Sequence, residues 1–482
     1  MYVTDMELIT AKLEYMGNVT NAKIIKEYIE GHNISKYVEG VKYYNNENTE
    51  ITNRKMYQYD SNGNKVQDEE VANNKVSHNF HKLLVDQKGA YLFGKPITIS
   101  NDKDKKLTEA INKKLAEDFN DKIQTLVRNS SNKGIEWLHV CFTDEKKGGE
   151  FKYRILPAEQ IIAIWDTSYQ EELEAVIYYY PIQINGRDSY RVEYWTDQNI
   201  EYYIKAENGE YVFDDTVKNN PCSHFYKNGQ GFGWGRVPFI PFRNNPEEYS
   251  DLKFYKSLID QYDKNVSDLA NNLEELQEIV FILKGYEGTD LSEFKQNLKK
   301  YKGIKVSEDG DVTSLSIQIP IEAKKEMLDR LEENIFMFGQ GVNFKTDKFG
   351  NNPSGVALKF IYNLLDLKAN ITERRFKKAI REFLWFVIEG IKIEQGSNSK
   401  ENNYKDFQIT VTKSPITNEA EIVDICTKSQ GIISKGTAMA HHPWVDDEQE
   451  EERKIKTEQQ EQLGESDPYL KPNKKVGGEN EE

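Results

Sequence analysis

The segment that comes closest to a catalytic motif is GAYLFGKP (residues 89–96), which fits the pattern G-x-x-x-x-G-K of a phosphate-binding loop. Such a loop needs Ser or Thr after the lysine to hold Mg²⁺, and here Pro96 follows Lys95. The four residues between Gly89 and Gly94 are apolar and continue a helical pattern, so their backbone amides would be engaged within a helix. We therefore predict the C-terminal end of a helix here and no nucleotide site.

No other group of residues forms a recognisable catalytic or metal-binding set. The glycines of GQGFGWG (residues 229–235) lack the G-x-G-x-x-G spacing, and Phe232 and Trp234 between them favour packing. The patterns G-x-S-x-G and H-E-x-x-H do not occur. Cys222 and His224 lie two apart without a second pair, so the cysteines suggest neither a zinc site nor a disulfide framework. We predict no catalytic residue, no metal and no cofactor.

Charge and hydropathy exclude several classes of protein. The formal net charge is −16, whereas proteins that hold DNA tightly have basic surfaces that neutralise phosphates. An acidic lining would instead let a polyanion slide without adhering. No run approaches the roughly 18–20 apolar residues of a membrane helix, and MYVTDMELIT lacks the features of a signal peptide. We therefore expect no membrane association and assembly in a reducing cytoplasm.

The first half of the chain is expected to begin with helices and to continue with strands. Residues 1–72 suggest short helices and an exposed, Asn-rich loop over 43–63. Residues 135–215 change to β-branched and aromatic runs with turns, which predicts a mostly β region. We expect helices over residues 24–30, from 76 up to Gly94, and over 107–128, and a short strand over 96–100.

The second half is predicted to be mainly helical. Residues 252–280 carry apolar side chains at alternating spacings of three and four, typical of one long helix with a seam. A compact insertion follows at 281–320, with an expected helix over 291–301 and strands over 303–306 and 313–319. Further helices are expected over 321–338 and 356–393, and a strand over 406–413. Residues 419–462 are expected to be helical with breaks around Gly436 and at HHPWVDD, and residues 466–482 to form a disordered tail.

Two features leave alternatives open. The helices over 252–280 and 321–338 have acidic outer faces, so they could form an ordinary hairpin in a core, or pack between copies and line a channel. The glycine- and asparagine-rich loop over 339–355 carries Lys345 and Lys348. It could contact a phosphate backbone lightly or be an exposed linker.

The order of these parts resembles the portal proteins of tailed bacteriophages, in particular those of siphophages of Gram-positive hosts. The phrases that carry the resemblance are NNKVSHNFHKLLVDQKGAYLFGKPITI (73–99), VPFIPFRNN (237–245) with SDLKFYKSLIDQYDKNVSDLANNLEEL (250–276), NPSGVALKFIYNLLDLKA (352–369) and HPWVDDEQEEERKI (442–455). The resemblance spans residues 20–462, and the order and spacing of the phrases make it specific.

The resemblance implies an α+β fold with named regions. Residues 1–250 with 356–414 would form an α/β wing that includes the long helix over 356–393. Helices 251–280 and 321–338 would form a stem, and 281–320 a small α/β clip between them. Residues 339–355 would form a tunnel loop and 415–465 a helical crown.

The resemblance also implies a function and a set of site residues. Copies would form a ring of twelve at one capsid vertex, through which double-stranded DNA is packaged and ejected without sequence preference. The terminase large subunit and then the head–tail adaptor would dock on it, and the major capsid and scaffold proteins would be further partners. The ring would assemble in the host cytoplasm and remain at the portal vertex of the virion. The implied residues are Asn343, Lys345, Thr346 and Lys348 for DNA contact, Asp260, Asp263, Asp268 and Glu274 for an acidic channel lining, and Lys284, Tyr286, Lys295 and Lys299 for docking on the clip.

Two other interpretations remain from the residues themselves. Another phage structural protein, such as a minor capsid or tail component, would share the acidic composition but would not need this order of helices, insertion and loop. An enzyme with an unrecognised nucleotide site would hydrolyse ATP, whereas a portal protein by itself would not, because the terminase is the ATPase.

Overall fold

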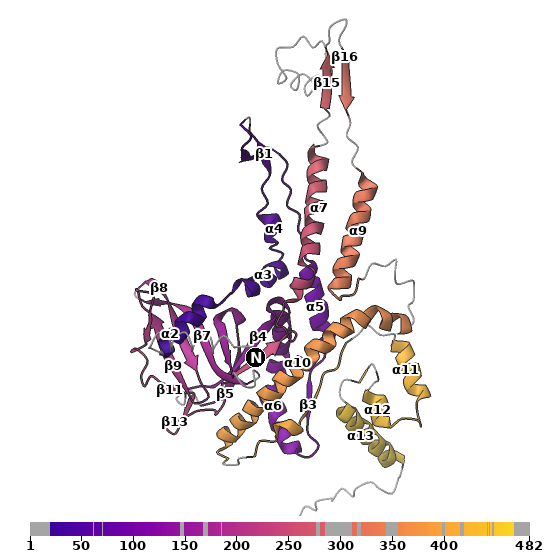
Figure 1. Cartoon of the computed structure of the whole chain (residues 1–482). Coiled ribbons are helices and arrows are strands. Elements are labelled where there is room, and N and C mark those ends of the chain that lie inside the picture. Colours follow the sequence, from indigo (N-terminus) through magenta and orange to yellow (C-terminus); the bar gives the residue numbers. More distant parts are fainter. Residues whose placement is uncertain are drawn as a thin grey trace, which may run out of the picture. The chain divides into compact units, whose positions relative to one another are not determined.

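The computed structural model describes residues 20–60, 62–69, 71–144, 149–166, 172–184, 186–275, 280–284, 311–315, 320–343, 355–397, 401–414, 419–440, 442, 444–445 and 448–466. The chain divides into two compact units. The first comprises Met1–Asn343 and Leu364–Ser414, and the second Phe344–Asn363 and Pro415–Glu482. Helices and strands both occur along the chain, which confirms the predicted mixed class (Figure 1).

Two antiparallel sheets confirm the predicted β region. The smaller has the order β14–β4–β5, and the larger the order β10–β9–β8–β7–β6 with β11 paired to β9. Their bounds are β4 Ile135–Phe142, β5 Phe151–Leu156, β6 Ile161–Trp165, β7 Leu173–Ile184, β8 Arg187–Trp195, β9 Asn199–Lys205, β10 Tyr211–Phe213, β11 Cys222–Ser223 and β14 Phe239–Arg243.

Successive side chains along a strand point to opposite faces of the sheet, and in the larger sheet both faces are buried. On β7, Val176 belongs to a cluster with Trp137 of β4, so this face packs against the smaller sheet. The next residue, Ile177, points the other way and packs in a cluster with Ile25 of helix α2 (Asn21–Gly31). The larger sheet therefore lies between the smaller sheet and α2.

The glycine-rich segment contributes a packed aromatic side chain, as predicted. The segment includes strand β13 (Gln230–Phe232), which pairs with β12 (Phe225–Lys227). Trp234 is buried and its ring centroid lies 5.4 Å from that of Phe142. The backbone N–H of Trp234 donates to Nδ1 of His224, and burial lowers the pKa of His224 to about 4. His224 is therefore a neutral core residue.

The segment predicted as one exposed loop over 43–63 is in part ordered secondary structure. It contains the end of α3 (Ser35–Tyr44), helix α4 (Thr49–Thr52) and strand β1 (Tyr57–Tyr59), which pairs with β2 (Lys65–Gln67). The local reason is a helix cap, because the side chain of Asn48 accepts a hydrogen bond from the backbone N–H of Glu50.

Two long helices follow. Helix α5 (Phe80–Phe93) ends at Gly94 as predicted, but it begins later than residue 76, because Asn79 caps it by accepting from the N–H of Lys82. Helix α6 (Lys105–Lys133) is longer than predicted and has a kink at Ala116. It ends at Gly134, whose φ of 92° places it in the left-handed region.

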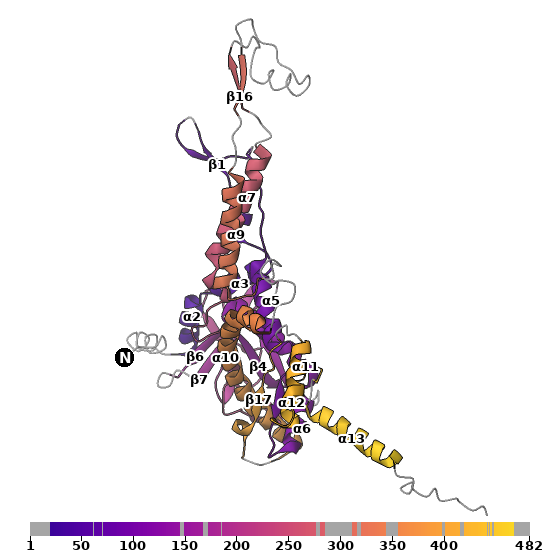
Figure 2. The ribbon, with the colours of Figure 1, turned by 90° about the vertical axis from the view of Figure 1, so that its right-hand side faces the viewer.

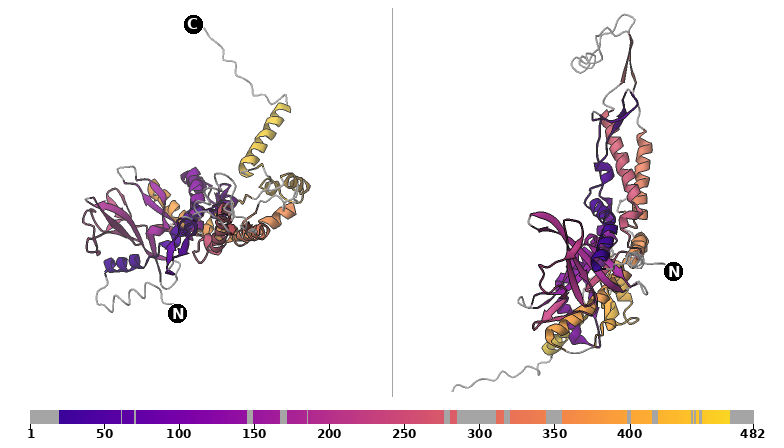
Figure 3. Two further views of the ribbon diagram at one scale, coloured as in Figure 1. Left: turned by 90° about the horizontal axis from the view of Figure 1, so that it is seen from above. Right: turned by 60° about the vertical axis from the view of Figure 1, so that its left-hand side comes forward.

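The predicted helix over 252–280 is shorter at both ends. Ser250 begins a 3-10 turn over Asp251–Phe254, helix α7 spans Lys256–Glu275, and Val280 already belongs to a strand. This strand, β15 (Val280–Lys284), pairs with β16 (Asp311–Leu315), and residues 285–310 and 316–319 of the predicted insertion lie outside the described residues. Helix α9 (Ile321–Phe338) has the predicted bounds. Figures 2 and 3 show α7 and α9 side by side, so the hairpin within one chain is observed.

The long helix is confirmed as α10 (Gly355–Gln395), a helix of 41 residues. Its part in the first unit buries the fully enclosed side chains Phe376, Ile380, Phe383 and Leu384. The predicted strand over 406–413 is the shorter β17 (Gln408–Thr410), which pairs with β3 (Thr98–Ser100).

The second unit contains three further helices, α11 (Glu419–Lys428), α12 (Lys435–Ala440) and α13 (Glu448–Ser466). Residues 429–434 separate α11 from α12, which confirms the break predicted around Gly436, although Gly436 itself lies within α12. Across the described ranges, no helix has the length and apolar character needed to cross a membrane. In the same ranges, no cluster of three or more His, Cys, Asp or Glu side chains is arranged for a metal ion.

Candidate functional site

The acidic side chains of α7 that were expected to line a channel contact the N-terminal part of the same chain. Asp260 accepts a hydrogen bond from the hydroxyl of Tyr43 and forms an ion pair with Lys256 at 2.9 Å. Asp268 forms an ion pair with Arg54, and its side chain is 37% exposed. These two carboxylates are therefore partly covered by residues more than 200 positions away in the sequence.

One polar face of α7 binds an extended segment, residues 74–78, along its length. The residues on this face, Asp263, Ser267 and Asn271, are spaced by four, so they lie above one another on the helix. Each of them accepts one backbone N–H, and the donors are every second residue of the segment. The N–H of His78 donates to Asp263 Oδ1 at 3.0 Å, that of Val76 to Ser267 Oγ at 3.0 Å, and that of Asn74 to Asn271 Oδ1 at 2.6 Å. This contact was not predicted, although the spacing of four between Asp263, Ser267 and Asn271 was visible in the sequence.

Asp263 is the centre of this contact and is fully buried. Its carboxylate also accepts from Nδ2 of Asn48 at 2.8 Å and lies 2.8 Å from Nδ1 of His78. Asp263 therefore cannot line a channel, and its prediction as a channel residue is wrong. Glu274 remains exposed and accepts from Nδ2 of Asn74 at 2.7 Å.

Most of the other predicted site residues lie outside the described residues. These are the loop residues Lys345, Thr346 and Lys348 and the insertion residues Tyr286, Lys295 and Lys299. Of the two that are described, Lys284 is the last residue of β15, opposite Asp311. Asn343 follows α9, and its Nδ2 lies 3.4 Å from Oε1 of Glu332.

Helix α9 carries exposed acidic side chains that were not among the predicted channel residues. They are Glu322, Glu326, Asp329 and Glu333, at spacings of four, three and four. This spacing places them on one face of the helix. Leu331, Ile335 and Phe336 are buried, and the latter two pack in a cluster with Tyr255 and Ile259 at the base of α7.

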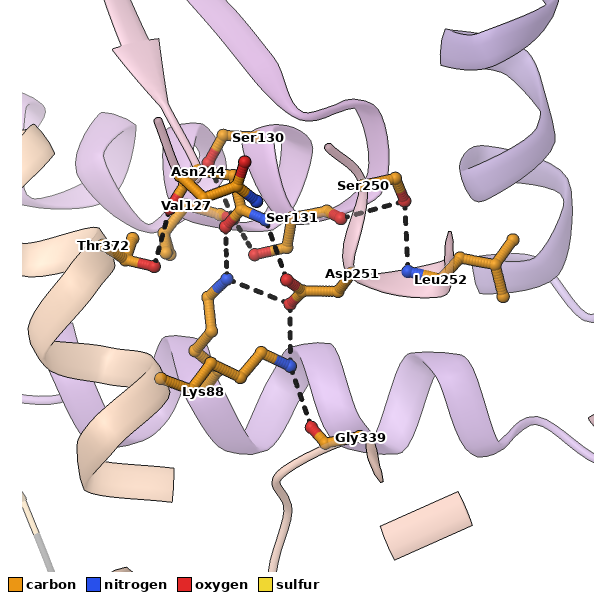
Figure 4. Close-up of polar contacts among 12 residues, drawn as sticks. Lys88, Val127, Ser130, Ser131, Asn244, Ser250, Asp251, Leu252, Gly339 and Thr372 are labelled. Carbon is orange, nitrogen blue, oxygen red and sulfur yellow. Dashed lines mark hydrogen bonds and ion pairs between the residues drawn. The ribbon is translucent and has the colours of Figure 1, made fainter. Parts of the chain in front are cut away.

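A buried cluster of charged side chains lies where the hairpin of α7 and α9 meets the rest of the first unit (Figure 4). Its centre is Asp251, the first residue of the turn before α7. The Nζ atoms of Lys88 and Lys368 lie 3.0 and 2.9 Å from Asp251 Oδ2. Asn244 donates through Nδ2 to the other carboxylate oxygen at 2.8 Å and accepts from Lys88 through Oδ1 at 2.5 Å.

Each member of this cluster comes from a different element. Lys88 lies on α5, Asn244 follows β14, Asp251 precedes α7 and Lys368 lies on α10. Lys368 also donates to the carbonyl oxygen of Gly339, directly after α9, at 3.0 Å. Thr372, one turn further along α10, donates to the carbonyl of Asn244 at 3.1 Å. The cluster thereby joins both helices of the hairpin to α5 and α10.

The electrostatics of the cluster follow from its burial. Burial lowers the pKa of Lys88 to about 8, because it disfavours the charged ammonium. Burial by itself would raise the pKa of the Asp251 carboxyl, but Lys368 and Lys88 outweigh it and hold that pKa well below its usual range. The two ion pairs of Asp251 hold together the elements that carry Lys88 and Lys368. Since the side chain of Lys88 is 0% exposed, it is not placed to react with a substrate.

The segment that resembled a phosphate-binding loop is part of this packed region. Its residues continue α5 as far as Phe93, so the predicted helix end is confirmed. The hydroxyl of Tyr91 donates to Asp366 on α10 at 3.0 Å, and its carbonyl accepts from the N–H of Ser414 at 2.9 Å. The backbone here is already used for secondary structure and packing.

Comparison with known proteins gives one consistent result from sequence. Residues 25–465 match the family described as "Phage portal protein, SPP1 Gp6-like". The chain is 40% identical over 439 residues to the portal protein of Bacillus phage SPP1, covering 90% of this chain and 86% of that one. It is 37% identical over 435 residues to the portal protein of Clostridium phage phiCD119, covering 84% of this chain and 91% of that one.

Solved structures with a similar chain include the neck of a native GTA particle computed with C12 symmetry. The TM-score is 0.41 at 10% identity, over 76% of this chain and 89% of that chain. The neck of an empty GTA particle computed with C6 symmetry gives a TM-score of 0.44 at 10% identity, over 76% of this chain and 90% of that chain.

Proposed function

The chain belongs to the SPP1 Gp6-like family of phage portal proteins, and from this premise we propose that its copies form a ring at one capsid vertex through which double-stranded DNA enters and leaves. The observation that carries the proposal is the match over residues 25–465, because it includes every described helix and strand from α3 to α12 and most of α2 and α13. The family membership favours this function over that of a minor capsid or tail component.

In this proposal the regions of the chain take the family's roles. The sheets with α5, α6 and most of α10 form the wing, α7 and α9 the stem, and residues 281–320 the clip. Residues 339–355 form the tunnel loop, and 415–465 the crown. The cluster around Asp251 supports this division, because it joins the base of the proposed stem to the proposed wing through buried ion pairs.

The acidic stem would act on DNA by repelling it. A tunnel lined by carboxylates keeps a polyanion from adhering, and many copies multiply the effect. The side chain that supports this role is the exposed Glu274 of α7, with the partly covered Asp260 and Asp268 contributing less. Asn343, Lys345, Thr346 and Lys348 of the tunnel loop would supply a weak contact with phosphates that does not depend on base sequence.

The proposed partners follow the same premise. The clip, through Lys284, Tyr286, Lys295 and Lys299, would bind first the terminase large subunit and then the head–tail adaptor. Major capsid and scaffold proteins would surround the ring during assembly in the host cytoplasm, and the ring would remain in the virion. The chain would itself catalyse no reaction.

The proposed function is tested by imaging the purified chain with negative-stain electron microscopy and measuring its mass under native conditions. We expect a ring of about a dozen copies with a central hole, as closed cyclic symmetry requires of a pore. A small closed dimer without a hole would contradict the proposal.

Replacing Lys345 and Lys348 together with Glu should reduce DNA packaging or retention while the ring still assembles. Reversing charges that contact phosphates weakens binding steeply, so we expect on the order of tenfold fewer DNA-filled particles. The measurement is the DNA content of particles assembled in infected or reconstituted extracts.

The matched control is Lys105→Glu with Lys106→Glu, which makes the same charge change at exposed positions in the first turn of α6. Acidic residues are tolerated there because they face the positive end of the helix dipole. Normal packaging by the loop variant would remove the two lysines from the mechanism.

A further inference from the structure

Helix α10 exposes a continuous stripe of side chains in the first unit. It begins with Leu364, Leu367 and Ile371, which are 37%, 51% and 48% exposed. It continues with the exposed basic residues Arg374, Lys378 and Arg381. The spacings along the stripe are three, four, three, four and three, so all six residues lie on one face.

This face is unusual for the outer side of a helix. The inner side of α10 is already packed, because Phe376, Ile380, Phe383 and Leu384 are fully buried. A helix with one buried face normally carries polar residues on the other. Alternating spacings of three and four are instead typical of a seam that packs against another helix. Exposed apolar residues in such a row mark an interaction surface.

The charge of the stripe points to the kind of partner. Each copy has a formal net charge of −16, so two copies repel unless a basic surface lies at their contact. A head-to-tail contact in a ring needs two different complementary surfaces on the same chain. The exposed face of α9 has the complementary character, with Glu322, Glu326, Asp329 and Glu333 in a row that ends at the exposed Met337.

We infer that the stripe from Leu364 to Arg381 is a surface through which one copy of this chain contacts the next. The inference rests on the proposed ring and adds the residues that hold its neighbours together. The apolar half of the stripe favours a second copy over DNA, because phosphate contacts use basic and polar groups and would leave three apolar side chains exposed.

The experiment compares two double variants of the full chain with the wild type. Leu367→Asp with Ile371→Asp removes the apolar half, and Arg374→Glu with Lys378→Glu reverses the basic half. Because these side chains lie at the surface, the monomer should keep its circular dichroism spectrum. We expect the concentration at which half of the chain is in rings to rise by at least about tenfold for each variant, as for central interface residues. Native mass measurement over a dilution series gives this concentration.

The matched control is Val212→Asp on β10, where the valine is 48% exposed and lies on the larger sheet. For this variant, the concentration at which half of the chain is in rings should equal that of the wild type. The inference is overturned if the stripe variants also assemble at that concentration, if Val212→Asp fails equally, or if the stripe variants form normal rings but no longer package DNA. A wild-type chain that forms no ring would overturn the proposed function, and the inference with it.

Discussion

The Asp251→Ala variant is expected to lose about 3–5 kcal/mol of free energy of unfolding, as is typical when one partner of a buried ion pair is removed. The loss arises because Lys368, whose side chain is 11% exposed, would keep its charge without a carboxylate. Lys88 is 0% exposed and its pKa already lies at about 8 with Asp251 present, so without Asp251 it would have to lose its proton or stay charged without a partner. Equilibrium urea titration of the full chain, followed by circular dichroism, measures the difference.

Two further variants separate this effect from a general sensitivity to substitution. Lys368→Met leaves the pair of Asp251 and Lys88 intact, so it should cost clearly less than Asp251→Ala. Asp86→Ala removes an exposed partner of Lys82, whose pair contributes at most about 1 kcal/mol. If Asp251→Ala and Asp86→Ala lost the same free energy of unfolding, the buried ion pairs of Asp251 would contribute no more than an exposed pair, which would contradict the prediction.

The contribution of Asp251 also has a definite pH dependence. Its pKa in the folded chain lies below its ordinary value of 3.8, so the folded state favours the ionised carboxylate. The advantage of the wild type over Asp251→Ala should therefore be complete above that pH and should shrink as the pH falls below it. Urea titrations at a series of acidic pH values test this direction.

The Gly134→Ala variant is expected to be destabilised through two additive effects. Gly134 has a φ of 92°, and a non-glycine residue held in such a conformation costs roughly 1–3 kcal/mol. A Cβ atom at this position would lie 1.9 Å from the carbonyl oxygen of Glu248, so backbone must shift, and overpacking of this kind costs roughly another 1–3 kcal/mol.

The chain offers a matched control for the second effect. Gly209 has a φ of 82°, but a Cβ atom there would meet nothing within 4 Å. Gly209→Ala should therefore show only the conformational cost, roughly 1–3 kcal/mol. Equal destabilisation of both variants in urea titrations would mean that the loop over 244–250 moves away from residue 134 without cost.

The consequences of Gly134→Ala should reach the buried cluster. The carbonyl of Gly134 accepts the backbone N–H of Asn244 at 2.8 Å, and Asn244 binds both Asp251 and Lys88. Displacing this loop would therefore move the residues that join α7 to the rest of the first unit. Gly134→Ala combined with Asp251→Ala should cost less than the sum of the two, because both weaken the same contacts.

The sequence by itself determined the elements whose signals are local. Pro320 and the apolar spacing that follows predict α9 with its observed bounds, and Gly94 marks the end of α5. The alternating strands and the long α10 were also predicted, because periodicity depends only on neighbouring residues. The family was identifiable from phrases whose order is kept along the chain, and it supplied the function without any contact being known.

Tertiary structure alone decided what the acidic face of α7 contacts. From the sequence, Asp263 had the same status as its neighbours on an exposed face. In the folded chain, residues 74–78 run along α7 in an extended conformation, and their backbone N–H groups need acceptors once they are covered. Asp263, Ser267 and Asn271 meet that need. The same holds for Lys88, Asp251 and Lys368, which are charged in the sequence and become a buried joint only because distant elements exclude water around them.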